Sequence, residues 1–251
     1  MMAISHVIKK ERIDRLLVRK GIVESREQAQ ALIARGVVQV GGRPVLKSST
    51  QVRANAALHL VEDAKIPYVS RGGLKLEAAL KAFEIDPSHK RVMDVGSSTG
   101  GFTDCLLQRG AAKVFAVDVG YGQLAWRLRK DSRVVCLERT NIRYLDPQLL
   151  DEPVDQVTID VSFISLKKVL PKILEVLKPR GSVLALVKPQ FEVGKGEVGR
   201  GGIVKEQSLH ERVIQDVIVF AQHLGFTFLG YISSPIPGKK GNVEYFLHLK
   251  K

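Results

Sequence analysis

From Ser70 to the C-terminus, short apolar segments alternate with segments of helical periodicity, and this alternation constrains the fold more than any other feature. Strands are predicted at 92–95, 114–117, 134–137, 157–160, 183–187, 226–232 and 243–249, and helices at 74–83, 102–108, 123–130, 166–177 and 207–224. Such alternation is typical of a mostly parallel sheet with helices on both faces, in which ligands bind at the carboxyl ends of the strands. We therefore expect an α/β domain with a seven-stranded, Rossmann-like sheet.

The first 60 or so residues have a different pattern, which predicts a small α+β domain. Two helices are expected at 12–20 and from Ser25 to Gly36, followed by short strands around Val38 and Leu58 and a turn at Gly41-Gly42. The predicted organisation is a small domain at 1–63, a linker at 64–70 and the α/β domain at 71–251.

Basic residues outnumber acidic ones by 39 to 26, which gives a formal net charge of +13. Residues 1–65 are the most charge-dense part, with 12 basic and 6 acidic residues. An excess of this size attracts polyanions and is a footprint of nucleic-acid binding. Arg12, Arg15 and Arg19 follow i, i+3, i+7 spacing and are predicted to share one face of the first helix, to which the second helix adds Arg26 and Arg35. These five arginines are the candidate nucleic-acid-binding side chains, although the spacing also fits a solvated basic face.

Several classes of protein are disfavoured by composition. No apolar run approaches the ~20 residues that a membrane-spanning helix needs, and no apolar signal segment precedes Lys9, so we expect a cytoplasmic protein. Cys105 and Cys136 stand alone, and the histidines have no metal-ligand spacing, so neither disulfides nor a metal site is expected.

A glycine-rich segment follows the first predicted strand of the α/β domain and opens a helix, as a nucleotide-type cofactor site requires. The spacing of its glycines is that of neither a dinucleotide-binding fingerprint nor a phosphate-binding loop. Asp118 ends the next strand, where a carboxylate would accept hydrogen bonds from ribose hydroxyls. Together these features resemble the S-adenosylmethionine pocket of class I methyltransferases. The candidate cofactor residues are Gly96, Ser98, Thr99, Gly100, Gly101, Phe102, Asp118 and Asn141. Two of them stay open: Phe102 fits the core as well as the cofactor, and Asn141 fits a turn cap as well as an adenine contact.

Four further polar residues fall at the ends of predicted elements: Lys75, Asp160, Lys188 and Glu244. Their order resembles the Lys–Asp–Lys–Glu tetrad of FtsJ-type RNA 2′-O-methyltransferases. The run Arg12-Ile-Asp14-Arg-Leu16, with Ser25-Arg26-x-x-Ala29-x-x-Leu32-Ile33-x-x-Gly36-x-Val38-x-Val40-x-Gly42, resembles the S4 RNA-binding domain. With the entry Val69-Ser-Arg-Gly-Gly-Leu-Lys75, the chain resembles the TlyA family, which is often labelled hemolysin.

This resemblance implies an S4-like domain before a class I methyltransferase domain, and methylation of cytidine 2′-hydroxyls in ribosomal RNA. S-adenosylmethionine would be the cofactor and ribosomal RNA or a ribosomal subunit the partner. The chain departs from the wider FtsJ pattern by having Phe102 in place of a Trp and Asn141 in place of an Asp. It ends seven residues after Glu244, which favours the large subunit alone as substrate. A non-catalytic ribosome-assembly factor and a membrane-lytic protein are the alternatives.

The expected roles follow from the chemistry of a weakly acidic hydroxyl. A base must remove its proton during attack on the methyl group. Lys188 is the candidate, because burial and a neighbouring cation such as Lys75 both favour a neutral amine. Asp160 and Glu244 would orient the lysines and the hydroxyl. The glycine-rich connection at 189–204 is a candidate lid over this site.

Overall fold

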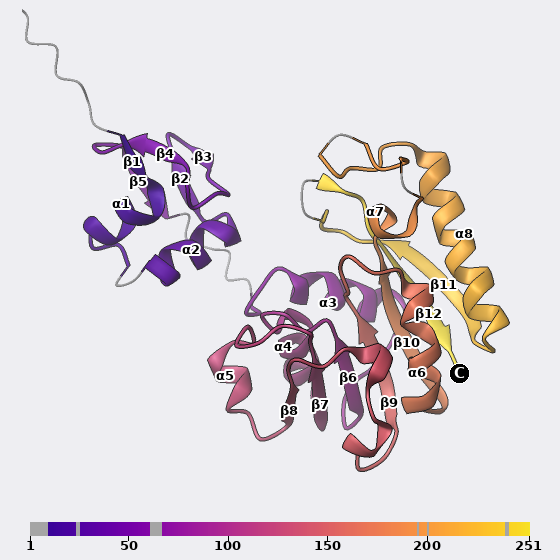
Figure 1. Cartoon of the computed structure of the whole chain (residues 1–251). Coiled ribbons are helices and arrows are strands. Elements are labelled where there is room, and N and C mark those ends of the chain that lie inside the picture. Colours follow the sequence, from indigo (N-terminus) through magenta and orange to yellow (C-terminus); the bar gives the residue numbers. More distant parts are fainter. Residues whose placement is uncertain (1–9, 24–25, 61–66, 195, 200, 239–240) are drawn as a thin grey trace, which may run out of the picture. The chain divides into compact units, whose positions relative to one another are not determined.

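The computed structural model describes residues 10–23, 26–60, 67–194, 196–199, 201–238 and 241–251 (Figure 1). The chain forms two compact units, Met1–Ile66 and Pro67–Lys251. The division between them falls inside the linker predicted at 64–70. Ser25, the predicted start of the second helix, lies outside the described residues.

The described residues of the N-terminal unit form two helices and five short strands. In chain order they are β1 (Lys10–Arg12), α1 (Ile13–Arg19), α2 (Arg26–Arg35), β2 (Val38–Val40), β3 (Arg43–Pro44), β4 (Gln51–Arg53) and β5 (Leu58–Leu60). β1 pairs with β4, and β2 lies between β3 and β5. Ile13, Leu16, Leu17 and Ile33 bury their side chains in its core.

One prediction for this unit is wrong. Arg12 belongs to β1, where it pairs with Gln51, and it does not share a helix face with Arg15 and Arg19. The backbone of Arg12 is extended, and the helix begins at the next residue, Ile13. Pairing between β1 and β4 therefore takes Arg12 out of the helix.

The C-terminal unit is built on a seven-stranded sheet, which confirms the predicted fold class. Its strands are β6 (Arg91–Val95), β7 (Lys113–Val117), β8 (Val134–Leu137), β9 (Val154–Ile159), β10 (Leu177–Val187), β11 (Thr227–Ser233) and β12 (Tyr245–Lys250). The strand order is β11-β12-β10-β9-β6-β7-β8, and only the pairings of β12 are antiparallel. The order reverses between β6 and β9, and such a switch point opens a crevice at the carboxyl ends of the strands.

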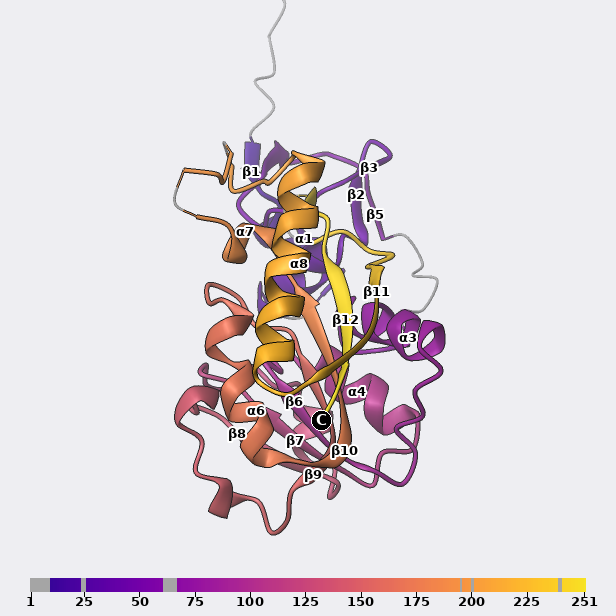
Figure 2. The same ribbon diagram turned by 90° about the vertical axis from the view of Figure 1, so that its right-hand side faces the viewer.

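Helices cover both faces of this sheet (Figures 1 and 2). α3 (Gly72–Ala82), α4 (Gly101–Gln108) and the short α5 (Trp126–Arg129) lie on one face, and α6 (Leu170–Val176) and α8 (Gln207–His223) lie on the other. Successive residues of a strand point to opposite faces of the sheet. Val95 and Val187 belong to the hydrophobic core under α6 and α8, whereas Phe246 packs on the other face against Phe102 of α4. No helix in the described part of the chain is long and apolar enough to span a membrane.

Two predicted helices are shorter in the structure. The helix predicted at 123–130 is reduced to Trp126–Arg129, because the preceding residues form a loop in which Gly122 N donates to Glu138. The helix predicted at 166–177 is divided into a 3₁₀ turn, Leu166–Lys168, and α6. Pro171 lies in the first turn of α6, where its missing N–H costs no helical hydrogen bond.

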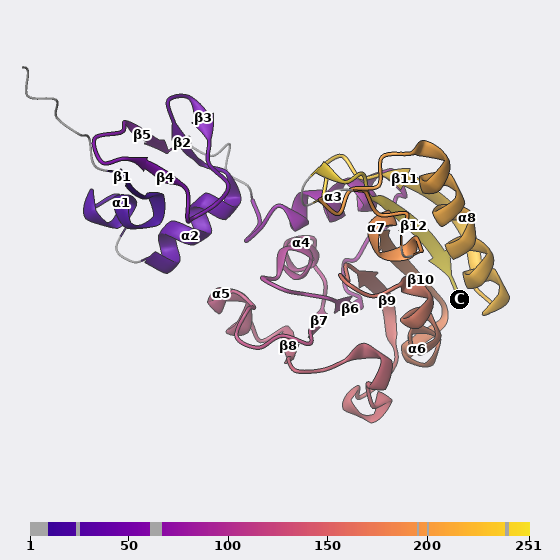
Figure 3. The same cartoon turned by 45° about the horizontal axis from the view of Figure 1, so that its top comes forward.

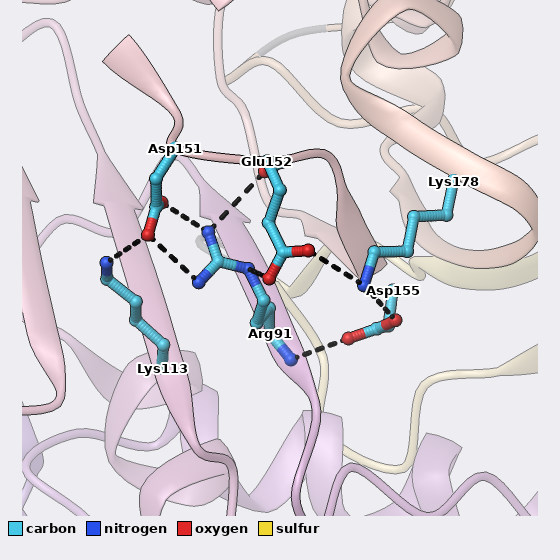
Figure 4. Close-up of polar contacts among 6 residues, drawn as sticks. All are labelled: Arg91, Lys113, Asp151, Glu152, Asp155 and Lys178. Carbon is cyan, nitrogen blue, oxygen red and sulfur yellow. Dashed lines mark hydrogen bonds and ion pairs between the residues drawn. The ribbon is translucent and has the colours of Figure 1, made fainter.

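A network of ion pairs ties the strands together at their amino ends (Figure 4). It contains Arg91, Lys113, Asp151, Glu152, Asp155 and Lys178. Arg91 begins β6 and its backbone N donates to Asp155 at 2.9 Å, while its guanidinium and the Lys113 amine both lie over the buried Phe115 ring. These cations are paired and packed at the end of the sheet away from the carboxyl-end crevice, so they serve the fold.

Candidate active site

The switch point between β6 and β9 brings the glycine-rich loop against Asp160. Asp160 N donates to Val95 O at 2.8 Å, and a Cβ built on Gly96 would lie 2.5 Å from the Asp160 carbonyl oxygen. Gly96 also has a φ of +84°, a conformation that costs other residues about 1–2 kcal/mol. Only glycine fits at 96, because the two strand ends approach so closely there.

The four predicted tetrad residues form two ion pairs. Lys75 Nζ lies 2.6 Å from Glu244 Oε2, and Lys188 Nζ lies 2.5 Å from Asp160 Oδ1. Lys188 and Glu244 are 8% and 3% exposed, so both charges are largely removed from water. Each lysine is paired with a carboxylate, which offsets part of the cost of burying the charge.

Strand register explains why these two pairs lie side by side. Lys188 follows β10. Glu244 was predicted to lie inside the last strand, but it immediately precedes β12. Val187 pairs with Tyr245 across these antiparallel strands, so Lys188 and Glu244 occupy the next positions of the same ladder. β9 flanks β10 on its other side and ends just before Asp160. All four residues thus meet at the carboxyl end of the sheet.

A buried carboxylate lies beneath this site. Asp94 of β6 is fully buried, and Thr103 Oγ1 donates to it at 2.6 Å. Burial raises the pKa of Asp94 to about 7, the hydrogen bond from Thr103 opposes this shift, and the nearby Asp160 charge adds to it. Asp94 is tied to the start of α4 and so fixes the floor of the glycine-rich loop.

The Asp118 carboxylate connects the glycine-rich loop to the end of β7. Its Oδ2 accepts from Ser98 N at 2.8 Å, and its Oδ1 accepts from Gly120 N at 2.7 Å. A carboxylate has about four acceptor positions, so two remain for hydroxyl donors. Ser98 and Thr99 are exposed, whereas Gly100 and Gly101 are buried at the start of α4.

The two open residues both have partners within the chain, and their contact with a cofactor stays a prediction. Phe102 is 3% exposed and stacks on Phe246, with ring centroids 6.0 Å apart, so it is a core residue. Asn141 caps the 3₁₀ turn Ile142–Tyr144, where its Oδ1 accepts from Arg143 N at 3.2 Å.

The loops after β9 and β10 are braced by residues that the sequence did not single out. Lys188 Nζ donates to Ser162 Oγ at 3.0 Å, and the Phe163 ring lies 4.9 Å from the Phe191 ring. Phe163 is 90% exposed and has a φ of +63°, an unusual conformation for a bulky residue and one that marks functional sites. The only sequence signal was the position of Ser162 and Phe163 directly after a strand-ending acid.

Glu192 is the second part of this brace. Its carboxylate accepts from Ser165 Oγ at 2.6 Å and from Leu166 N at 2.7 Å, and burial raises its pKa. Glu192 belongs to α7 (Pro189–Glu192), directly after Lys188, whereas Ser165 follows Asp160. The carboxylate thus holds together the two loops that carry one tetrad ion pair.

Glu192→Ala is expected to lower the single-turnover rate of the reaction at this site about tenfold, because the freed Leu166 N–H costs ~1–3 kcal/mol and loosens the loop. Glu192→Gln retains an acceptor oxygen and should keep most of the rate. Glu175→Ala, which removes an exposed partner of Lys172, is the matched control. Equal rates for Glu192→Ala and the control would contradict the brace.

The connection at 189–204, predicted as a lid, is anchored at its C-terminal end. Val204 N donates to Asn242 Oδ1 at 3.2 Å, and its carbonyl lies 2.9 Å from the buried His210 ring. Its use as a lid stays a prediction.

The predicted RNA-binding arginines have different surroundings in the N-terminal unit. Arg12 and Arg26 both pair with the buried Asp14 carboxylate, whereas Arg19 pairs with Glu11. Arg15 is exposed, and the side chain of Arg35 lies outside the described part of the structure. The described residues contain no cluster of metal-ligating side chains.

Comparison with known proteins assigns both units to families. A model of the FtsJ-like methyltransferase family matches residues 68–251. The chain belongs to the FtsJ-like methyltransferase family. A model of the S4 domain matches residues 11–58, in the N-terminal unit. The predicted recognition is therefore confirmed for both units.

Relatives that match nearly the whole chain place this FtsJ-like methyltransferase in the TlyA family. The chain is 50% identical over 242 residues to the 16S/23S rRNA (cytidine-2′-O)-methyltransferase TlyA of Mycobacterium tuberculosis, covering 96% of this chain and 90% of that protein. It is 40% identical to Hemolysin A of Brachyspira hyodysenteriae, covering 94% and 98%. A solved structure of a hemolysin-named protein from Streptococcus thermophilus superposes with a TM-score of 0.77 at 44% identity, covering 98% and 90%.

Proposed function

We propose that this methyltransferase transfers a methyl group from S-adenosylmethionine to the 2′-hydroxyl of a cytidine in ribosomal RNA. The observation that carries the proposal is the convergence of Lys75, Asp160, Lys188 and Glu244 in two ion pairs at the carboxyl end of the sheet. The M. tuberculosis relative is identical to this chain at half of the aligned positions, and its name supports the same reaction.

The residues around the glycine-rich loop fit S-adenosylmethionine. The Asp118 carboxylate keeps acceptor positions for the two ribose hydroxyls, and the exposed Ser98 and Thr99 border the same loop at the start of α4. Bound S-adenosylmethionine supplies an electrophilic methyl group. The chain has to supply the rest, which is the alignment of the hydroxyl and the removal of its proton.

In this proposal, the Lys188 ammonium that pairs with Asp160 first releases a proton to water. The neutral amine then accepts the proton of the ribose hydroxyl at Nζ as the methyl group is transferred. Asp160 and Ser162 fix the position of Nζ, since both contact it. The Lys75–Glu244 pair lies at the next position of the β10–β12 ladder and holds the hydroxyl in line. The low exposure of Lys188 and Glu244 keeps bulk water away from the reacting atoms.

Asp118→Ala is expected to weaken S-adenosylmethionine binding by about 1–3 kcal/mol, the scale of a hydrogen bond to a charged group. Calorimetry measures the change in the dissociation constant. Asp131→Ala, which removes a partly exposed partner of Arg133 outside the crevice, is the matched control. An unchanged dissociation constant for Asp118→Ala would overturn the assignment of the ribose site.

Incubation with separated ribosomal subunits tests the substrate. The M. tuberculosis relative is named for both 16S and 23S RNA, and a Campylobacter jejuni relative, 38% identical over 185 residues, is named for 23S RNA alone. We expect methyl transfer to the large subunit. Cofactor binding without transfer to either subunit would instead support a non-catalytic assembly factor.

A further inference from the structure

Three aromatic side chains lie mostly in solvent in the segment between the end of β7 and the turn after β8. Tyr121, Trp126 and Tyr144 are 69%, 67% and 76% exposed. A cation lies over each ring: Arg139 Cζ is 4.2 Å from the centroid of Tyr121, Lys130 Nζ is 4.7 Å from Trp126, and Arg143 Cζ is 5.0 Å from Tyr144. We call these six residues the edge surface.

The cations of the edge surface differ from those in the network at the amino ends of the strands. There, Arg91 and Lys113 lie over the buried Phe115 ring and are also paired with Asp151 (Figure 4). Lys130, Arg139 and Arg143 form no ion pair with any residue that the structure describes. Their charges are therefore available to an anionic partner.

Hydrogen bonds join the segments of the edge surface into one continuous region. Arg139 N donates to Gly120 O at 2.9 Å, and Gly122 N donates to Glu138 Oε1 at 2.8 Å. Glu138 also pairs with Arg129 of α5. Figure 3 shows α5 beside β8, which is the last strand of the sheet on this side.

The edge surface lies at the same end of the sheet as the tetrad. Thr140 N donates to Asp118 O at 2.9 Å, and Ser98 N donates to the Asp118 carboxylate at 2.8 Å. The loops after β6, β7 and β8 are thus linked at the carboxyl ends of their strands. A chain that enters the crevice from the β8 side passes over the exposed rings.

We propose that the edge surface binds an unpaired segment of the RNA substrate, next to the nucleotide that is methylated. Exposed aromatic rings stack on unpaired bases, and neighbouring cations pair with the phosphates between those bases. The segment 119–144 contains six basic and two acidic residues, and both acidic ones are already paired with arginines, so its charge complements RNA. The inference rests on the proposed function, because it names how that RNA is held.

Full-length variants separate stacking from charge. The stacking variant is Trp126→Ala with Tyr144→Ala, and the charge variant is Lys130→Gln with Arg143→Gln. Tyr231→Ala, on the opposite edge strand β11, controls the first. Lys81→Gln with Lys250→Gln, two exposed lysines, controls the second. Fluorescence anisotropy measures binding to a single-stranded RNA of about 12 nucleotides and to a duplex of the same length.

The stacking variant is expected to bind the single strand at least about tenfold more weakly, with a smaller loss for the duplex. The charge variant should lower the slope of log affinity against log salt by about 1.4, from two phosphate contacts at ~0.7 each. Calorimetry should show unchanged S-adenosylmethionine binding in both.

Wild-type affinity in the stacking variant, or equal losses in the controls, would overturn the proposal. A loss of cofactor affinity with unchanged RNA affinity would also overturn it and assign the rings to the cofactor. If the wild-type protein shows no methyl transfer while single-strand binding still depends on the edge surface, the proposed reaction fails and the RNA surface stands.

Discussion

Replacing Lys188 with methionine is expected to reduce the single-turnover rate of methyl transfer by about 10²–10⁴-fold, the usual scale for loss of a general base. Methionine keeps a similar volume but cannot accept the hydroxyl proton. The fold should be retained, because the neighbouring Asp160 is partly exposed and can be solvated when its partner is lost. S-adenosylmethionine affinity, measured by calorimetry, should stay within about twofold of wild type.

Lys188→Arg separates proton transfer from simple charge. A guanidinium retains the pairing with Asp160 but stays protonated, so this variant should be nearly as slow as Lys188→Met. Lys178→Met, which removes a partly exposed lysine of the network at the amino ends of the strands, serves as the control and should transfer at the wild-type rate. A near wild-type rate in Lys188→Arg would mean that a fixed cation is sufficient and would eliminate the general-base role.

Asp14→Ala is expected to unfold much of the N-terminal unit. The Asp14 side chain is fully buried and pairs with Arg12 at 2.9 Å and Arg26 at 3.0 Å. Loss of such a carboxylate costs about 3 kcal/mol. The free energy of unfolding of a unit of this size is only ~3–10 kcal/mol, at ~0.05–0.15 kcal/mol per residue. Hydrogen exchange should show lost protection in α1 and α2, and affinity for ribosomal RNA should fall.

The methyltransferase unit supplies an internal control for this variant. Every Phe, Tyr and Trp of the chain lies after residue 66, so the fluorescence of Trp126 reports on the C-terminal unit alone and should not change. Glu11→Ala removes the partly exposed partner of Arg19 and should cost less than ~1 kcal/mol. Protection of α1 and α2 in Asp14→Ala equal to that in Glu11→Ala would contradict the structural role of Asp14.

The same carboxylate gives the N-terminal unit a predictable acid dependence. The Arg12 hydrogen bond lowers the pKa of Asp14, against the effect of burial, and Arg26 and Gln30 lower it further. A lowered folded-state pKa contributes stability above the unfolded value of ~3.9, and this stability is lost as the pH falls toward the folded value. Wild type should therefore lose protection in α1 and α2 below about pH 4, and Asp14→Asn should show a weaker dependence.

The tetrad was predicted from its resemblance to the FtsJ pattern and from the position of its members at the ends of elements, three of them beside apolar strands. Asp160 and Lys188 directly follow buried strands and Glu244 directly precedes one, so polar residues there stand out against their neighbours. The strand order then brings the ends of β9, β10 and β12 together. The parallel pattern predicts this edge for Asp160 and Lys188, whereas Glu244 joins them because β12 runs antiparallel to β10.

Other features depend on tertiary contacts that leave no local pattern. Glu192 reaches Leu166 across 26 residues of sequence, and Phe163 reaches Phe191 across 28. The start of α1 was misplaced because the β1–β4 pairing, which includes Arg12 and Gln51, is only three residues long. β4 has one buried residue, Val52, so the sequence shows no alternation of apolar and polar residues there. Phe102 and Asn141 stayed open because both of their alternatives satisfy the same local sequence.

The most direct test of the account is the position of the methyl group on the modified nucleoside. Ribosomal RNA from the subunits is treated with the protein and isotopically labelled S-adenosylmethionine, digested to nucleosides and analysed by mass spectrometry. The tetrad predicts that the label is on the ribose, as 2′-O-methylcytidine, and that it is absent with Lys188→Met. Label on the cytosine ring, or equal labelling by Lys188→Met, would contradict transfer to a ribose hydroxyl by this site.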